Sequence, residues 1–344
     1  MSDRECADLS LADKITNETE LIQTYLAPLA AGAPGAFGLA DDAALLTPEP
    51  GTSLVISCDP IIAGVHFFPT DRADDIAWKA LAVNVSDLAA KGALPLAYTM
   101  ALALPEAPGR AWMSEFSAGL KSAQLAFGCH LIGGDTDRTP GPLSISITAF
   151  GKVPHGQMIA RGGAKIGDFV FVTGTLGDAA LGLKLRQSPE ALGTSMTADA
   201  RQHFLSRYLR PRPRLETVPL LRQYASAALD ISDGLVKDAG RLANGANAAL
   251  SIETRHLPFS IAAEQALAGD ASLITTLVSG GDDYEILFAV PAEKHEAFIA
   301  HARLHGTVIS EIGRLTAGTG VTITLPNGHP LAIHNTGYDH FRNR

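Results

Sequence analysis

Apolar and polar residues follow one another along the chain in two successive runs of strand-like and helix-like patterns. In the first run we expect a helix that starts after Asn17 and continues through Ala30, because Glu20 stands where a capping box needs it. The other elements expected here are helices over 75–90 and 111–127 and strands over 54–58, 96–104, 130–133 and 143–150. In the second run we expect strands over 169–173, 227–231 and 284–290 and helices over 178–185, 198–208, 215–224 and 235–243. Strands and helices alternate in both runs, which predicts two α/β or α+β domains.

The stretch "GKVPHGQMIARGGAKIGD", residues 151–168, separates the two runs. It is rich in glycine and in residues typical of turns, so it is the best candidate for a domain boundary. We therefore expect an N-terminal domain over 1–152 and a C-terminal domain over 153–344.

Composition limits the class of protein. With 344 residues, of which 46% are hydrophobic, the chain is long enough for a large core. A net charge of -9 argues against a broad nucleic-acid-binding surface. The three cysteines, Cys6, Cys58 and Cys129, are far apart, which argues against a disulfide framework or a zinc cage. The first twenty residues show no signal peptide, and charges interrupt the most apolar region, 77–105, so we expect a cytoplasmic protein without a membrane span.

Acidic residues recur at the ends of expected strands and beside glycines. They are Asp42 (after Asp41), Asp59 with Ser57 nearby, Asp87, Asp135 after a strand and a glycine pair, Asp230 and Asp233 around Ser232, and the acids of "SGGDDYEILF", Asp282, Asp283 and Glu285. A single aspartate in such a place is usually a turn former or a helix cap. The whole set, however, suits hard, oxygen-liganded cations such as Mg²⁺, which bridges protein carboxylates to phosphates.

Several of these residues also have simpler interpretations. Asp87 lies in an otherwise apolar helix, where an unpaired carboxylate is costly, and Lys91 one turn later could pair with it. His66 could be a hydrogen-bonded, partly buried histidine. The segment "RYLRPRPRL" could be an anion-binding patch, but its two prolines favour a rigid connection between helices with solvated arginines. The sequence contains no P-loop, dinucleotide-binding or H-E-x-x-H motif.

Eight blocks, taken in order, closely resemble thiamine-monophosphate kinases, a family of the aminoimidazole ribonucleotide synthetase superfamily. The blocks are "DDAALL", "ISCDPIIAGVHF", "WKALAVNVSDLAAKGALP", "LIGGDT", "ARGGAKIGDFVFVTGTLGDAALGL", "LDISDGL", "SGGDDYEILF" and "GYDHF". The resemblance implies an N-terminal α/β domain that pairs with its twin in a homodimer, and a C-terminal α+β domain. It implies that ATP phosphorylates thiamine monophosphate to thiamine diphosphate in a cleft that holds several Mg²⁺ ions. The apolar region 81–104 is a second reason to expect a dimer.

The resemblance also assigns roles to residues. Metal binding falls to Asp42, Ser57, Cys58 (through its backbone), Asp59, Asp87, Asp135, Asp230 and Asp233. ATP contacts fall to Gly134, Asp135, Arg161 and Ser232, and contacts to thiamine phosphate fall to His66 and Asp282. The chain departs from the family pattern at Ala40 (usually Gly), Cys58 (Thr), Lys91 (Met), Asp282 (Glu) and Asn335. Asn335 stands near a stacking aromatic of the family, so the nearby Tyr338 becomes the candidate.

A phosphate monoester oxygen is already anionic near neutral pH, so its attack on ATP needs positioning and charge neutralisation rather than a general base. We therefore assign no catalytic base. Two alternatives remain. One is another ATP-dependent enzyme of the superfamily, such as an aminoimidazole ribonucleotide or selenophosphate synthetase, although Cys6 lies in a glycine-free segment unlike the reactive cysteine of the latter. The other is a non-catalytic nucleotide-binding relative, which would be expected to lose metal-site acids.

Overall fold

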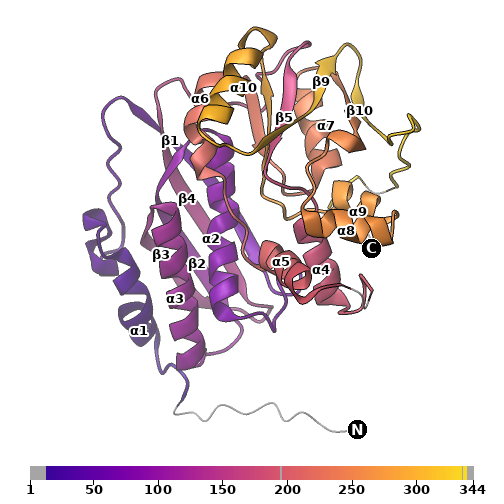
Figure 1. The fold of residues 1–344 in the computed structure, drawn as a ribbon. Coiled ribbons are helices and arrows are strands. Elements are labelled where there is room, and N and C mark those ends of the chain that lie inside the picture. Colours follow the sequence, from indigo (N-terminus) through magenta and orange to yellow (C-terminus); the bar gives the residue numbers. More distant parts are fainter. Residues whose placement is uncertain (1–12, 194–195, 335, 339–344) are drawn as a thin grey trace. The chain divides into compact units, whose positions relative to one another are not determined.

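A computed structural model describes residues 13–193, 196–334 and 336–338 (Figure 1). Cys6, Asn335 and the end of "GYDHF" lie outside the described residues. The chain divides into two compact units, with the main boundary between Lys152 and Val153. Residues 51–55 and 86–94 cluster with the second unit although they precede that boundary. Each unit is described separately below.

The first unit is built on a four-stranded sheet with the strand order β1-β4-β2-β3. The strands are β1 (Thr52–Ile62), β2 (Leu94–Leu104), β3 (His130–Arg138) and β4 (Ser144–Pro154). Our prediction that Asp135 follows a strand is wrong, because β3 continues in parallel register with β2 as far as Arg138. The strands stay paired there because Gly134 has no side chain: a Cβ on it would lie 1.9 Å from the Met100 carbonyl oxygen.

Helices α2 (Ala73–Ala90) and α3 (Arg110–Phe127) lie over one face of this sheet (Figure 1). Both agree with the predicted helices to within two residues at each end. Leu81, Val85 and Leu88 of α2 are 0% exposed, which explains why this helix shows no polar face in the sequence.

The N-terminal helical segment differs from the regular helix that we expected. Asn17 caps it, since its side chain accepts a hydrogen bond from the Glu20 N–H at 2.8 Å. The segment then changes from α-helix (α1, Glu18–Leu21) to a π turn (Ile22–Leu26) and a 3₁₀ turn (Ala27–Ala30). Pro28 lies at the start of the 3₁₀ turn, where its missing N–H cannot continue an α-helical hydrogen-bond pattern. A further 3₁₀ segment covers Pro34–Leu39.

The second unit contains a mixed six-stranded sheet with the order β10-β7-β9-β5-β8-β6. Its strands are β5 (Phe169–Thr173), β6 (Ala227–Asp230), β7 (Ala249–Glu253), β8 (Ile286–Val290), β9 (Ile309–Thr316) and β10 (Gly320–Thr324). Its helices are α4 (Asp178–Gln187), α5 (Ala198–Leu209), α6 (Val218–Tyr224), α7 (Leu235–Gly245), α8 (Ile261–Gly269), α9 (Leu273–Ser279) and α10 (His295–Leu304). Short 3₁₀ turns cover Leu215–Thr217, Thr254–His256 and Ala292–Lys294.

Strand β5 shows how the sheet of the second unit is buried on both faces. Val170 and Val172 pack in one apolar cluster with the inner face of α7. Phe171, between them, packs in another cluster with residues of α6 and α10. Because neighbouring residues of a strand point to opposite faces, the uninterrupted apolar run of β5 reflects burial on both sides. No helix among the described residues has both the length and the apolar character needed to cross a membrane.

Candidate active site

In the first unit, carboxylates gather around a cavity of about 270 Å³. Asp42, Gly134 and Asp135, all predicted from the sequence, line it together with Asp41 and Glu18. Asp135 is held in place because its side chain accepts a hydrogen bond from the Thr136 N–H at 2.9 Å. The sequence did not single out Glu18, which reaches the cavity from the N-terminal helical segment and accepts a hydrogen bond from the Thr136 hydroxyl at 3.0 Å.

The consecutive residues Ser57, Cys58 and Asp59 lie in β1 of this sheet. The buried Asn84 of α2 fixes the backbone of Asp59: its side-chain oxygen accepts from the Asp59 N–H at 2.8 Å, and its amide donates to the Asp59 carbonyl at 3.3 Å. The Thr148 hydroxyl donates to the Cys58 sulfur at 3.2 Å. The side chain of Cys58 is thus engaged within the sheet, in agreement with a role for its backbone alone.

His66 follows β1 and is half-buried. Its Nδ1 accepts a hydrogen bond from the Ile62 N–H at 3.0 Å, which places the ring proton of the neutral imidazole on Nε2. The ring is therefore held in one orientation by its own turn. This hydrogen bond agrees with the simpler interpretation of His66 and is also compatible with ligand binding through Nε2.

In the second unit, the predicted metal ligand Asp230 has a strongly shifted pKa. It is 8% exposed, and its carboxylate accepts a hydrogen bond from the Ser86 hydroxyl at 2.7 Å. Burial, followed by the negative charge of Asp87, raises the pKa of Asp230 well above its usual value. The two negative charges repel each other, and a cation bound between the carboxylates would offset this repulsion.

Lys91 was the alternative partner for Asp87. Its ammonium donates a hydrogen bond to the Ala228 carbonyl at 2.6 Å. Burial lowers the pKa of Lys91, and Asp230 opposes this change more strongly than Asp87 does. The Lys91 ammonium therefore interacts mainly with the Ala228 carbonyl of β6 and with the carboxylate of Asp230. The exposed Arg161 lies close enough for its positive charge to help lower the pKa of Lys91.

Asp233 already has cationic neighbours in the second unit. Its Oδ2 lies 2.9 Å from the Lys237 ammonium and 2.6 Å from the Arg241 guanidinium. The Asp233 carbonyl accepts a hydrogen bond from the Tyr338 N–H at 3.1 Å, which fixes the backbone of this predicted substrate-binding residue beside a predicted metal ligand.

The acidic stretch "SGGDDYE" pairs with the "DISDG" segment. The Asp282 N–H donates to the Ser232 carbonyl at 2.9 Å, and the Tyr284 N–H donates to the Ile231 carbonyl, also at 2.9 Å. A Cβ on Gly281 would lie 2.3 Å from the Ser232 carbonyl oxygen, so this contact requires glycine. The structure thus brings the predicted ATP residue Ser232 next to the predicted substrate residue Asp282.

The three acids of this stretch have different roles. Asp282 is only half-buried, and it has an unusual backbone φ of 70°. Asp283 is 1% exposed and accepts hydrogen bonds from the Gly177 N–H at 2.8 and 3.0 Å. Burial raises the pKa of Asp283 well above its usual value. Asp283 therefore anchors the loop, whereas the half-buried Asp282 accepts a hydrogen bond from the Tyr284 hydroxyl at 3.3 Å.

Glu285 anchors the other end of the stretch and is 0% exposed. Its carboxylate accepts hydrogen bonds from the Thr173 hydroxyl at 2.7 Å, Arg207 Nη2 at 2.8 Å and Arg214 Nε at 2.6 Å. Burial disfavours the charge of Arg214, but the hydrogen bonds and charge of Glu285 outweigh it, so the pKa of Arg214 lies above its usual value. The prediction that the arginines of "RYLRPRPRL" are solvated is wrong for Arg207 and Arg214.

The donor sets of both units fit Mg²⁺. The cavity of the first unit collects carboxylates without a lysine or arginine among its lining residues, and in the second unit Asp87 raises the pKa of Asp230. Carboxylate oxygens are the ligands that Mg²⁺ prefers. Within 13–193, 196–334 and 336–338, no three His, Cys, Asp or Glu side chains are already arranged as one complete metal-binding group.

The fold and these carboxylate groups define a protein built from the two domains of AIR synthase-related proteins. Residues 40–153 match "AIR synthase related protein, N-terminal domain", and residues 165–326 match "AIR synthase related protein, C-terminal domain". The thiamine-monophosphate kinase of Escherichia coli (strain K12) is 40% identical over 304 residues, covering 88% of this chain and 91% of that protein. The chain therefore belongs to the thiamine-monophosphate kinase family.

Solved structures agree with this assignment. Thiamine-monophosphate kinase from Stenotrophomonas maltophilia K279a is 41% identical, with a TM-score of 0.76 over 85% of this chain and 91% of that chain. AaThiL complexed with AMPPCP and TMP is 31% identical, with a TM-score of 0.74 over 86% of this chain and 89% of that chain. The Escherichia coli hydrogenase maturation protein HypE is 20% identical, with a TM-score of 0.73 over 92% of this chain and 97% of that chain, which shows a shared fold only.

Proposed function

We propose that the chain is an enzyme that transfers the γ-phosphate of ATP to thiamine monophosphate, forming thiamine diphosphate. The observation that carries the proposal is its 40% identity to a curated thiamine-monophosphate kinase over 88% of the chain. The relative solved with AMPPCP and TMP supports the same pair of substrates, with AMPPCP in the place of ATP. Use of ATP also fits the cytoplasmic location expected from the sequence.

Each of the two units is proposed to contribute residues that bind Mg²⁺ and ATP. In the first unit, Asp42, Ser57, the Cys58 backbone, Asp59 and Asp135 would hold Mg²⁺, and Gly134 and Asp135 would meet the phosphates of ATP. In the second unit, Asp87, Asp230 and Asp233 would hold Mg²⁺, and Arg161 and Ser232 would contact ATP. Bound Mg²⁺ would supply neutralisation of the negative charge on the phosphates.

Thiamine monophosphate would be oriented by His66, Asp282 and Tyr338. Asp282 is suited to this task because Asp283 and Glu285 anchor the segment that directly follows it. The acceptor phosphate is already anionic near neutral pH, so the role of these residues is to bring it into line with the γ-phosphate. No residue is assigned as a general base.

We also infer a homodimer formed through the N-terminal domain. The original sequence argument for it is weakened, because Leu81, Tyr98 and Leu102 of the apolar region are each at most 1% exposed within one chain. A different feature supports the proposal. Strand β1 is at the edge of its sheet, and its Ile56 is 59% exposed. An apolar edge strand is a surface that proteins normally cover.

The test is a product assay with purified protein, ATP, Mg²⁺ and thiamine monophosphate, followed by chromatography of the thiamine compounds. We expect thiamine diphosphate to accumulate with the wild-type chain and not with an Asp87→Asn variant purified in parallel. That variant controls for host kinase carried through the purification. Absence of thiamine diphosphate, with ATP hydrolysed only when another acceptor is supplied, would favour a different enzyme of the superfamily.

A further inference from the structure

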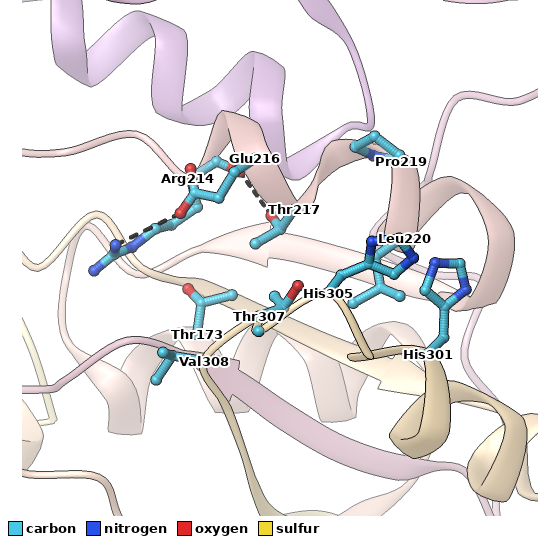
Figure 2. Close-up of a pocket in the computed structure, with 11 residues that line it drawn as sticks. Thr173, Arg214, Glu216, Thr217, Pro219, Leu220, His301, His305, Thr307 and Val308 are labelled. Carbon is cyan, nitrogen blue, oxygen red and sulfur yellow. Dashed lines mark hydrogen bonds and ion pairs between the residues drawn. The ribbon is translucent and has the colours of Figure 1, made fainter. Parts of the chain in front are cut away.

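The second unit contains a cavity of about 500 Å³ that involves none of the residues assigned to the reaction (Figure 2). Its polar lining includes Thr173, Arg214, Glu216, Thr217, His301 and His305. Arg214 and Thr173 are already engaged by Glu285. The two histidines are the lining groups whose chemistry the proposed reaction does not use.

His301 and His305 are spaced as ligands of one metal ion would be. His301 belongs to α10, and His305 is the C-cap residue whose N–H still donates to the His301 carbonyl at 3.1 Å, so the helical spacing continues. Figure 2 shows the two imidazoles next to each other beside Leu220. Their ring centroids are 4.6 Å apart. An ion bound at about 2.0–2.1 Å to one nitrogen of each ring would separate the centroids by about 4.5 Å at a right angle and about 5.2 Å at a tetrahedral angle.

The surroundings of the two rings favour a cation. Nδ1 of His301 lies 3.2 Å from the Tyr224 hydroxyl. When Nδ1 carries the proton and donates it to Tyr224, Nε2 presents its lone pair, as metal-binding histidines commonly do. Both rings are also at the C-terminal end of α10, where the helix dipole favours positive charge.

Glu216 lines the same cavity, but its carboxylate lies 3.6 Å from Arg214 Nη1 and belongs to no group of three ligand side chains among the described residues. The two imidazoles are therefore the ligands that the protein offers here. Imidazole ligands suit ions of the Zn²⁺, Ni²⁺ and Cu²⁺ class, whereas Mg²⁺ selects oxygen ligands.

The geometry points to a transition-metal site that is formed by His301 and His305 and is separate from the proposed Mg²⁺ sites. The two imidazoles chelate the ion, and water fills the remaining positions. This inference does not depend on the kinase activity.

The test is a titration of the full-length, tag-free chain with Ni²⁺ or Zn²⁺, measured by calorimetry and by competition with a chromophoric chelator. A large excess of Mg²⁺ occupies the oxygen-ligand sites throughout. We expect one ion per chain, and a loss of affinity of at least about tenfold in His305→Ala and in His301→Gln. His301→Gln keeps a polar group near Tyr224, and His305 is exposed, so both variants should fold.

A double variant of two exposed histidines elsewhere, His329→Ala with His334→Ala, is the matched control and should bind as the wild type does. The inference is overturned if the wild type binds no ion, or if His305→Ala and His301→Gln, folded by circular dichroism, bind as tightly as the wild type.

Discussion

Glu285 is the residue on which the anchoring of the "SGGDDYE" stretch can be tested most sharply. Its fully buried carboxylate accepts hydrogen bonds from Thr173, Arg207 and Arg214. Glu285→Gln keeps the size of the side chain but replaces one accepting oxygen by an amide that can only donate. It also leaves the guanidinium groups of Arg207 and Arg214 without the charge that neutralises them.

Removing one partner of a buried ion pair costs about 3–5 kcal/mol. For a domain of this size, each kcal/mol lowers Tm by about 2–4 °C, so we expect Glu285→Gln to melt about 6–20 °C lower than the wild type. Asp282 precedes Glu285 by three residues. Loosening this end of the stretch should therefore raise KM for thiamine monophosphate more than KM for ATP.

The matched control is Glu216→Gln, because Glu216 also faces Arg214 but is 62% exposed and 3.6 Å away. Its loss should cost less than about 1 kcal/mol. The assay is urea unfolding of the two variants beside the wild type, followed by steady-state kinetics at a temperature where all three are folded. If Glu285→Gln and Glu216→Gln are equally stable, the proposed anchoring role of Glu285 is wrong.

Four further predictions concern the site and the assembly. Turnover should stop in EDTA and return with Mg²⁺; activity that persists in EDTA would exclude the metal proposal. Asp87→Asn should lose most activity while the metal-free protein melts at the same or a higher temperature, because the charge of Asp87 raises the pKa of Asp230; an active, slightly less stable variant would instead mean that Asp87 only pairs with Lys91. Asp282→Ala should raise KM for thiamine monophosphate about five- to hundred-fold with little change for ATP, and Asp282→Glu should be tolerated; equal KM values would make the stretch purely structural. Light scattering at micromolar concentration should give the mass of a dimer, and a monomer mass would contradict the dimer proposal.

The pH dependence of stability gives a separate prediction for Asp283. Burial raises its pKa in the folded state, so the folded protein binds this proton more tightly than the unfolded chain does. Its contribution to stability is complete below the unfolded pKa of about 3.9 and is lost as the pH rises through the folded pKa. Relative to the wild type, Asp283→Asn should therefore gain stability as the pH rises above about 4. A stability difference that does not change with pH, measured by urea unfolding, would contradict this reasoning.

Local sequence patterns predicted the regular elements well. Strand β5 has the expected limits, and α2 and α3 are within two residues of theirs, because an apolar run or a periodic face is a local property of the chain. The strand limits around Asp135 were wrong because a glycine pair usually ends a strand, whereas here it allows close pairing with Met100. That distinction depends on a neighbouring strand and is not visible in the segment itself.

Some residues of the candidate site could also be predicted from local sequence motifs, whereas others could not. Family motifs identified Asp42 and Asp135, which line one cavity, and Asp87 and Asp230, which interact electrostatically. The role of Arg214 was missed because its partner Glu285 is 71 positions away along the chain. Glu18 was missed for a similar reason, since nothing near it in the sequence indicates that it reaches the cavity beside Asp135.

We propose that this chain moves the γ-phosphoryl group of ATP directly to thiamine monophosphate. The most direct measurement uses ATP labelled with heavy oxygen in its γ-phosphate and mass spectrometry of the thiamine products. We expect thiamine diphosphate with the label in its terminal phosphate, and ADP as the other product. Unlabelled thiamine diphosphate, formation of AMP and pyrophosphate, or no thiamine diphosphate from active, folded protein would contradict it.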